Sequence, residues 1–86
     1  MLKQVYVKRE VINQIKEKRQ KDKISQAVLA TCLGVSVVSI QRFENKGEVS
    51  LILLERIAAF LDYKLDYGNL FEQKVFKNLN DVTGIK

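Results

Sequence analysis

The sequence predicts a mainly α-helical domain of four to five helices followed by one short β-strand. Apolar residues recur at helical spacing over most of the first 61 positions. Three of these segments are preceded by serine, which favours a helix N-terminus, and two are followed by glycine, which favours a helix end. After Leu61 the apolar period shortens to two residues, as in a strand. These three observations predict both the fold class and the order of the elements.

The first helix is expected over residues 9–21, where the long stem of Arg19 continues the apolar face. The second is expected over residues 26–33, with Ser25 as its N-cap. Gly34 ends it because glycine adopts the left-handed conformation without steric cost. The expected inward residues of these two helices are Val11, Ile12, Ile15, Leu29, Ala30 and Leu33.

The third helix is expected over residues 37–45, with Ser36 as its N-cap and a turn at Lys46-Gly47. The fourth is expected from Ser50, its N-cap, to about Leu61. The expected inward residues of these two helices are Ile40, Phe43, Leu51, Leu54, Ile57, Ala58 and Leu61.

Residues 63–67 alternate between apolar and polar side chains, which predicts a short, half-buried strand. A single strand is not stable alone, so it is expected to pair either with residues 3–7 or with the same strand of a second protomer. Residues 69–79 have a weak helical pattern, and the polar end of the chain is expected to fray.

The composition excludes several classes of protein. A chain of 86 residues with 47% hydrophobic and 29% charged residues fits one folded, soluble domain. There is no apolar run of the ~20 residues that span a bilayer and no signal-peptide pattern, so a cytoplasmic protein is expected. Cys32, the one cysteine, is expected to be buried and reduced. With no histidine, phosphate-binding glycine loop or metal-ligand cluster, we expect no enzyme, cofactor or metal site.

The net charge of +5 lies in the first third of the chain. Up to Gln26, eight basic residues stand against three acidic ones, and the remainder of the chain is balanced. A positive field of this kind attracts phosphates, and the resulting binding depends strongly on salt. The alternative is a first helix whose charges are simply solvated, and the charge pattern alone does not separate the two.

A linked pattern of residues covers the second to the fourth expected helix. It consists of Ile24-Ser25-Gln26, Leu29-Ala30, Leu33-Gly34-Val35-Ser36, Ile40, Arg42-Phe43-Glu44, Leu54, Ile57-Ala58 and Leu61. This pattern resembles the lambda-repressor-like helix-turn-helix family, also called the Xre or Cro/CI type, over roughly residues 11–61. The stretch LDYKLDY further resembles HipB-like members, whose C-terminal strands pair across a dimer.

The resemblance implies a sequence-specific transcriptional regulator of bacterial or phage origin that binds double-stranded DNA. On this basis residues 1–86 are a single domain, and residues 9–61 are its helix-turn-helix DNA-binding core. Residues 62–86 are then a strand and helix extension for dimerisation or partner binding.

Ala30 and Gly34 are expected to build the turn, because the two helices cross closely at a small residue and glycine relieves a Cβ clash. The resemblance also implies that Arg19 pairs with Glu44 and so fixes the angle of the recognition helix. The alternative is two independently solvated charges, since surface ion pairs contribute little.

The first turn of the recognition helix is expected to enter the major groove. Its expected base-reading residues are Val37, Val38, Ser39, Gln41 and Arg42. Arg42 can bind guanine with two hydrogen bonds, and the valines offer apolar contact to thymine methyl groups. Because valines on a helix more often lie in the core, burial is their alternative role. The expected phosphate-binding residues are Lys18, Ser25, Gln26, Asn45 and Lys46, with Gln41 as a borderline case.

Six apolar or aromatic residues on the fourth helix and the strand would leave an apolar patch on a monomer. They are Ile52, Leu53, Phe60, Tyr63, Leu65 and Tyr67. We expect a homodimer to cover them and to place two recognition helices ~34 Å apart on a pseudo-palindromic site. The alternative is that residues 69–79 fold back over the patch.

Two functions therefore remain open for the sequence. The first is a repressor that acts by occupying a promoter. The second is the antitoxin of a toxin–antitoxin module, which autorepresses its operon and binds a toxin. The strand and the apolar pairs Leu70-Phe71 and Val75-Phe76 leave the second function open.

Overall fold

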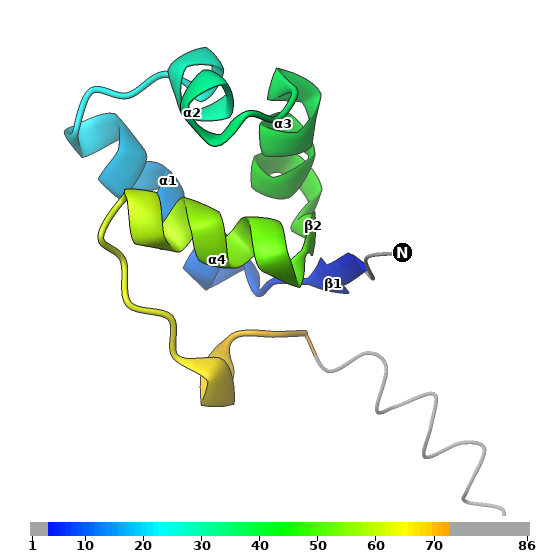
Figure 1. Cartoon of the computed structure of the whole chain (residues 1–86). Helices are drawn as coiled ribbons and strands as arrows, with labels where there is room; N and C mark the ends of the chain where they lie inside the picture. The colour runs from blue at the N-terminus through cyan, green and yellow to red at the C-terminus, as the bar shows by residue number, and fades with distance from the viewer. Residues whose placement is uncertain (1–3, 73–86) are drawn as a thin grey trace, which may run out of the picture.

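The computed structural model describes residues 4–72, which form four α-helices, two short strands and one 3-10 helix (Figure 1). The mainly helical fold expected from the sequence is confirmed. In chain order the elements are β1 (Gln4–Tyr6), α1 (Arg9–Lys21), α2 (Gln26–Leu33), α3 (Val37–Lys46), β2 (Glu48–Ser50), α4 (Leu51–Phe60) and the 3-10 helix η1 (Tyr67–Asn69). None of the helices within residues 4–72 has the length and apolar character needed to cross a bilayer.

Serine hydroxyls begin three of the helices. In α2, α3 and α4 the hydroxyl of the N-cap accepts a hydrogen bond from the backbone N–H three residues later, at 3.0 to 3.3 Å. The three N-caps are Ser25, Ser36 and Ser50. Glycine ends two of the helices in the left-handed conformation, with φ of +69° at Gly34 and +75° at Gly47. Local hydrogen bonding and backbone freedom therefore set these boundaries.

The apolar faces of the four helices meet in one core. Every inward residue predicted for the helices is buried except Leu51, which is 37% exposed. Leu51 is the first residue of α4, at the outer end of the buried stripe that begins with Leu54. Phe43 and Ile40 of α3 are fully buried, so the core fixes the inner face of that helix.

Cys32 is exposed, so its predicted burial is wrong. The buried face of α2 consists of Leu29, Ala30 and Leu33. At about 100° per residue, Cys32 points roughly a quarter-turn or more away from the centre of that face. The apolar stretch of sequence therefore predicted burial, but the side chain of Cys32 points away from the buried face of the helix.

β1 pairs antiparallel with β2, a strand that the sequence pattern did not predict. Val5 lies opposite Val49, and the Val7 N–H donates to the Gly47 carbonyl at 3.0 Å. A three-residue strand is too short to show alternation, which explains why β2 gave no signal.

The predicted strand over residues 63–67 is absent: residues 63–66 form an irregular segment, and Tyr67 begins η1. Tyr63 and Leu65 pack against the core while Lys64 stays exposed, so the alternation reflects one buried side without a hydrogen-bonded neighbour strand. The Asp66 carboxylate then accepts a hydrogen bond from the Gly68 N–H at 3.2 Å and turns the chain.

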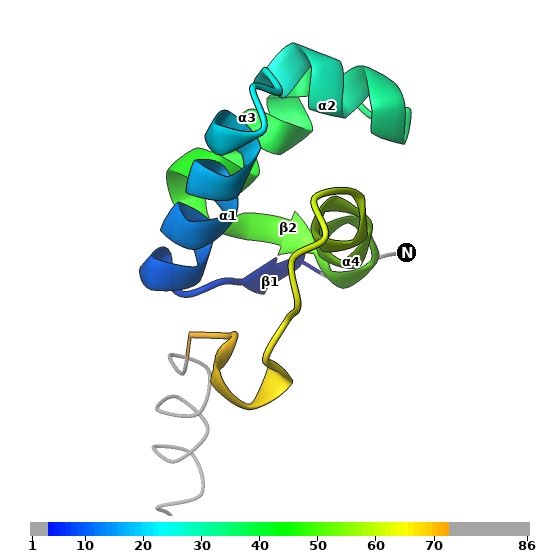
Figure 2. The same cartoon turned by 90° about the vertical axis from the view of Figure 1, so that its left-hand side faces the viewer.

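A β-contact to the N-terminal segment does form, but later in the chain. Val7 and Phe71 make an isolated antiparallel bridge, flanked by hydrogen bonds from the Lys8 N–H to the Leu70 carbonyl and from the Glu72 N–H to the Tyr6 carbonyl. Figure 2 shows this C-terminal segment, in yellow and orange, below β1. Of the helix predicted over residues 69–79, the part after Glu72, including Val75 and Phe76, lies outside the described residues.

Gly47, which directly follows α3, lies close to Val7 and to Ile12 of α1, and this contact provides a test of the fold. A Cβ at this position would lie 2.8 Å from Ile12 Cδ1 and 2.9 Å from the Val7 carbonyl oxygen. We expect Gly47→Ala to lower the free energy of unfolding by about 2–5 kcal/mol, from left-handed strain together with overlap. Gly34→Ala is the matched control, because its φ is similar but no atom lies within 4 Å, and it should cost about 1–2 kcal/mol. Equal losses in urea unfolding would contradict the close approach.

Candidate nucleic-acid interface

The segment from α2 to α3 has the geometry of a helix-turn-helix. The two helices pack on each other at one end of the molecule and are joined by a turn over residues 34–36 (Figure 1). Ala30 is buried where they meet, and its carbonyl accepts a hydrogen bond from the Val35 N–H at 3.0 Å. The inner face of α3 lies in the core, so its outer face is presented to solvent.

The five predicted base-reading residues differ in their exposure. Val38 is 53% exposed, Gln41 and Arg42 are exposed, and Ser39 is half-buried. Val37 is half-buried and packs against the core, which is the alternative role considered for it. The first two turns of α3 therefore present a mixed apolar and polar surface with one guanidinium group, that of Arg42.

Most of the predicted phosphate-binding residues also have contacts within the protein. The hydroxyl of Ser25 caps α2, and the Gln26 amide donates to Glu44 Oε1 at 2.8 Å. Lys18 lies 3.5 Å from the Asp22 carboxylate, an exposed pair that holds a lysine only weakly. Lys46 and the side chain of Asn45 are exposed at the end of α3.

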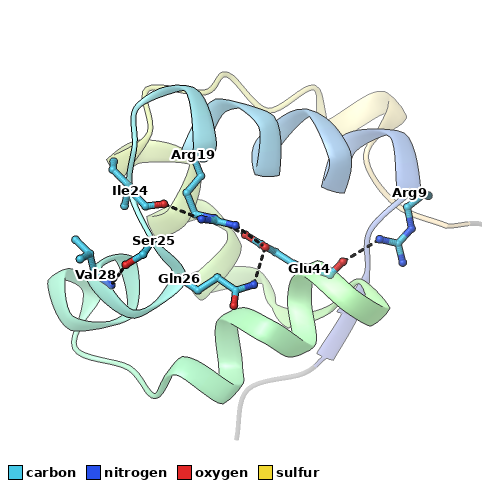
Figure 3. A network of polar contacts seen from close by, with 7 residues as sticks. All are labelled: Arg9, Arg19, Ile24, Ser25, Gln26, Val28 and Glu44. Atoms are coloured by element: carbon cyan, nitrogen blue, oxygen red, sulfur yellow. Dashed lines mark hydrogen bonds and ion pairs between the residues drawn. The ribbon is translucent and has the colours of Figure 1, made fainter.

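A buried ion pair joins α1 to α3. Arg19 Nε lies 2.7 Å from Glu44 Oε2 and its Nη2 lies 3.0 Å from Oε1, so the pair is bidentate (Figure 3). Arg19 and Glu44 are 6% and 3% exposed. Arg19 Nη1 also donates to the Ile24 carbonyl, and Glu44 accepts from Gln26, so neither charge is left without partners. Such pairs need full hydrogen bonding to offset the cost of removing both charges from water.

Two further arginines bind the C-terminal ends of helices, and the sequence pattern indicated neither. Arg9 donates to the carbonyls of Glu44 and Asn45, at 2.9 and 2.8 Å, where α3 ends. Arg56 donates to the Leu33 carbonyl at 2.6 Å, where α2 ends. Both pairs are more than 20 residues apart in sequence, so local spacing carries no signal for them.

The positive charge of the first third is only partly available to a ligand. Arg19 is buried, Arg9 is bound to carbonyls of α3, and Lys8 Nζ donates to the Asn69 side chain at 2.6 Å. Lys21 and Lys23 are exposed near the end of α1. The two interpretations of the charge therefore apply to different residues: some cations hold the fold together, and others face solvent.

The six residues of the predicted dimer interface fall into two groups. Ile52, Phe60 and Tyr67 are 52%, 42% and 54% exposed. Leu53, Tyr63 and Leu65 are half-buried and pack against the core of their own chain. The apolar surface available to a partner is therefore smaller than the sequence suggested.

Both tyrosines of this group hydrogen-bond through their hydroxyls. Tyr67 donates to Glu55, and this hydrogen bond raises the pKa of Tyr67 above its usual value. Tyr63 donates to Gln14, and burial, followed by the nearby charges of Asp66 and Glu10, raises the pKa of Tyr63. Both hydroxyls therefore stay protonated near neutral pH.

Comparison with known families matches residues 15–68 to the helix-turn-helix family. The match begins within α1, includes α2 to α4 and ends in η1. No curated protein and no solved structure matches the chain.

The contribution of the buried pair is measurable by unfolding. We expect Glu44→Ala to lower the free energy of unfolding by about 3–5 kcal/mol, because it leaves the Arg19 charge buried without its partner. The double variant Arg19→Ala, Glu44→Ala should cost less than the sum of the single variants by about 1–3 kcal/mol. Lys18→Ala, in the exposed pair, is the control and should cost at most about 1 kcal/mol. Additive losses in a double-mutant cycle would show that the two side chains do not act as a pair.

Proposed function

This chain belongs to the helix-turn-helix family of the lambda-repressor-like type and is a DNA-binding transcription regulator. We propose that it is a repressor and that it binds a pseudo-palindromic operator as a dimer. The outer face of α3 enters the major groove, and occupancy of the promoter excludes transcription. The family is one of DNA-binding regulators and not of enzymes. We propose the cytoplasm as its location, because the DNA it regulates lies there.

The observation that carries this proposal is the exposed face of α3, held by a buried ion pair on its other side. Arg42 has the reach and donor geometry to bind guanine with two hydrogen bonds, and Val38 offers a methyl surface to thymine. Ser39 and Gln41 can donate to or accept from base edges. Val37, packed on the core, supports the first turn and contributes at most an edge of its side chain.

Phosphate contacts orient the helix without reading sequence. We propose that Lys18 and Lys46 bind DNA phosphates through their positive charge. Ser25, Gln26 and Asn45 lie along the DNA backbone and contact its phosphates without a charge. The amide of Gln26 is bonded to Glu44, so its contribution to phosphate binding comes from its position in the first turn of α2, whose backbone N–H groups and dipole favour an anion.

We propose a homodimer that buries the exposed residues Ile52, Phe60 and Tyr67, with Leu53, Tyr63 and Leu65 supporting them from below. The exposure of three large apolar side chains on α4 and the segment after it supports this surface. In this arrangement residues 9–61 read DNA and residues 62–86 form the extension that completes the contact between protomers.

The antitoxin function is the alternative, and it has less support. It rested on a C-terminal strand over residues 63–67 and on the apolar pairs Leu70-Phe71 and Val75-Phe76. The strand is absent, Leu70 and Phe71 pack against the core of their own chain, and Val75 and Phe76 lie outside the described residues. A toxin that co-purifies with the protein would favour this alternative. Repression without such a partner favours the simple regulator.

Selection of bound sequences from a random DNA pool tests the function. We expect an enriched half-site with G at the position that contacts Arg42 and T beside Val38. Arg42→Ala should then cost about 1–3 kcal/mol on the selected site and relax the preference at that base pair. Lys46→Ala is the matched comparison, because loss of a phosphate contact should weaken binding to all sequences alike and lower the salt slope by about one. A pool that shows no enriched sequence would contradict sequence-specific recognition.

Sedimentation of the protein without DNA tests the dimer. We expect Ile52→Glu, Phe60→Glu to shift the mass from dimer to monomer, because two charges would be buried at the contact. Val28→Glu is the control, since Val28 is 51% exposed but lies on α2 outside the proposed surface. A wild-type protein that sediments as a monomer at all concentrations would rule out the dimer.

A further inference from the structure

We propose that Arg9 is a positioning residue for sequence reading, which acts with Arg19 as a two-point clamp on Glu44. Arg19 binds the side chain of Glu44, and Arg9 binds its main-chain carbonyl. The inference depends on the proposed function, because it concerns how accurately α3 is presented to DNA.

The two arginines come from opposite ends of one helix. Arg9 is the first residue of α1, and Arg19 lies ten residues later, about 15 Å along the helix axis. Figure 3 shows both guanidinium groups directed at Glu44, from the two ends of α1. On α3 the two contacts meet Glu44 at its side chain and at its main-chain carbonyl, and the second extends to the carbonyl of Asn45. The side-chain pair restrains the angle of α3, and the main-chain contacts restrain the position of its last turn.

The contact of Arg9 has a local physical basis at the end of α3. The last carbonyls of a helix lack partners within it and carry the negative end of its dipole. The two terminal nitrogens of Arg9 bind the carbonyls of Glu44 and Asn45 at 2.9 and 2.8 Å. An arginine is suited to this role because its planar fork presents two donors at fixed spacing, which a lysine ammonium does not.

The backbone that carries Arg9 is itself fixed. The Val7 N–H donates to the Gly47 carbonyl directly after α3, and the Lys8 N–H donates to the Leu70 carbonyl, each at 3.0 Å. Arg9 therefore extends from a point that is tied both to the end of α3 and to the C-terminal segment.

A small tilt of α3 is enough to disturb base contacts. The helix has ten residues, so its first turn lies about 13 Å from its end. A tilt of about 5° at one end moves the other by about 1 Å, which is more than the distance range of a good hydrogen bond. Loss of the Arg9 contact should therefore reduce selective binding more than it reduces general attraction to DNA.

Arg9→Lys separates positioning from charge. The lysine keeps the positive charge but cannot bind both carbonyls in the same geometry. We expect Arg9→Lys and Arg9→Ala each to lower affinity for the selected site by about tenfold, with little change on a scrambled duplex. The salt slope of Arg9→Lys should equal that of the wild type. Lys21→Ala is the matched control on the same helix, and it should leave the ratio of specific to scrambled affinity unchanged.

Two results would overturn the proposal. One is an Arg9→Lys variant with the wild-type ratio of affinities, since this would show that only charge matters. The other is an Arg9→Ala variant that loses affinity equally on both duplexes with a salt slope lower by about one, which is the signature of a phosphate contact.

Hydrogen exchange in the protein without DNA gives an independent reading. The amides of Lys46 and Gly47, at the end of α3, should exchange several-fold faster in Arg9→Ala than in the wild type, because the last turn loses its anchor. Unchanged exchange would overturn the clamp itself. If the wild type selects no DNA sequence, the proposed function fails, whereas this measurement still decides whether Arg9 holds α3.

Discussion

The buried ion pair between Arg19 and Glu44 is the interaction on which the presentation of α3 depends. It joins the first and third helices across the core, and Gln26 and the Ile24 carbonyl bring the second helix and its entry into the same network. Because each buried side-chain nitrogen and oxygen of the network has a hydrogen-bond partner, the cost of desolvating the two ions is offset. Apolar packing of Ile40 and Phe43 fixes the inner face of α3 against the core. The directional hydrogen bonds of the bidentate pair add a restraint on the angle at which the outer face is shown.

The distribution of cations follows from the same constraint. Within residues 4–26, Arg19, Arg9 and Lys8 are engaged through a buried pair, helix-end carbonyls and an asparagine, and Lys18 pairs with Asp22 at the surface. Positive charge serves in these places to satisfy carbonyls and a carboxylate that the fold leaves without partners. The exposed face of α3 has few charges, with Arg42 as its cation among the predicted base readers. Selectivity in the proposed function then depends on the shape and position of this face more than on general attraction to phosphate.

In the region after Leu61 the sequence pattern does not predict the secondary structure correctly. Alternation at Tyr63 and Leu65 predicted a strand, and in the structure both side chains are half-buried against the core without a neighbouring strand. Period-two alternation needs only an extended backbone with one buried side. Whether a ladder forms depends on which segment lies alongside, and in this chain Phe71, not residues 63–67, reaches Val7. The prediction that Cys32 is buried failed for a related reason. The apolar residues around it in the sequence suggested burial, but the direction in which a side chain points from its helix decides its exposure.

The sequence by itself determined the four α-helices of residues 4–72, their boundaries to within a residue, and their inner faces except at Leu51. Serine caps, left-handed glycines and helical periodicity each involve residues no more than about four positions apart. They can therefore be recognised in the sequence. The identity of the helix-turn-helix was legible for the same reason, since its linked residues lie in one continuous stretch. The tertiary structure alone decided that Arg9 binds the end of α3, that β2 pairs with β1, and that Phe71 lies beside Val7. These contacts join segments 35 or more residues apart. They depend on where the packed core leaves carbonyls and strand edges without hydrogen-bond partners. The spacing of residues along the sequence does not predict those positions.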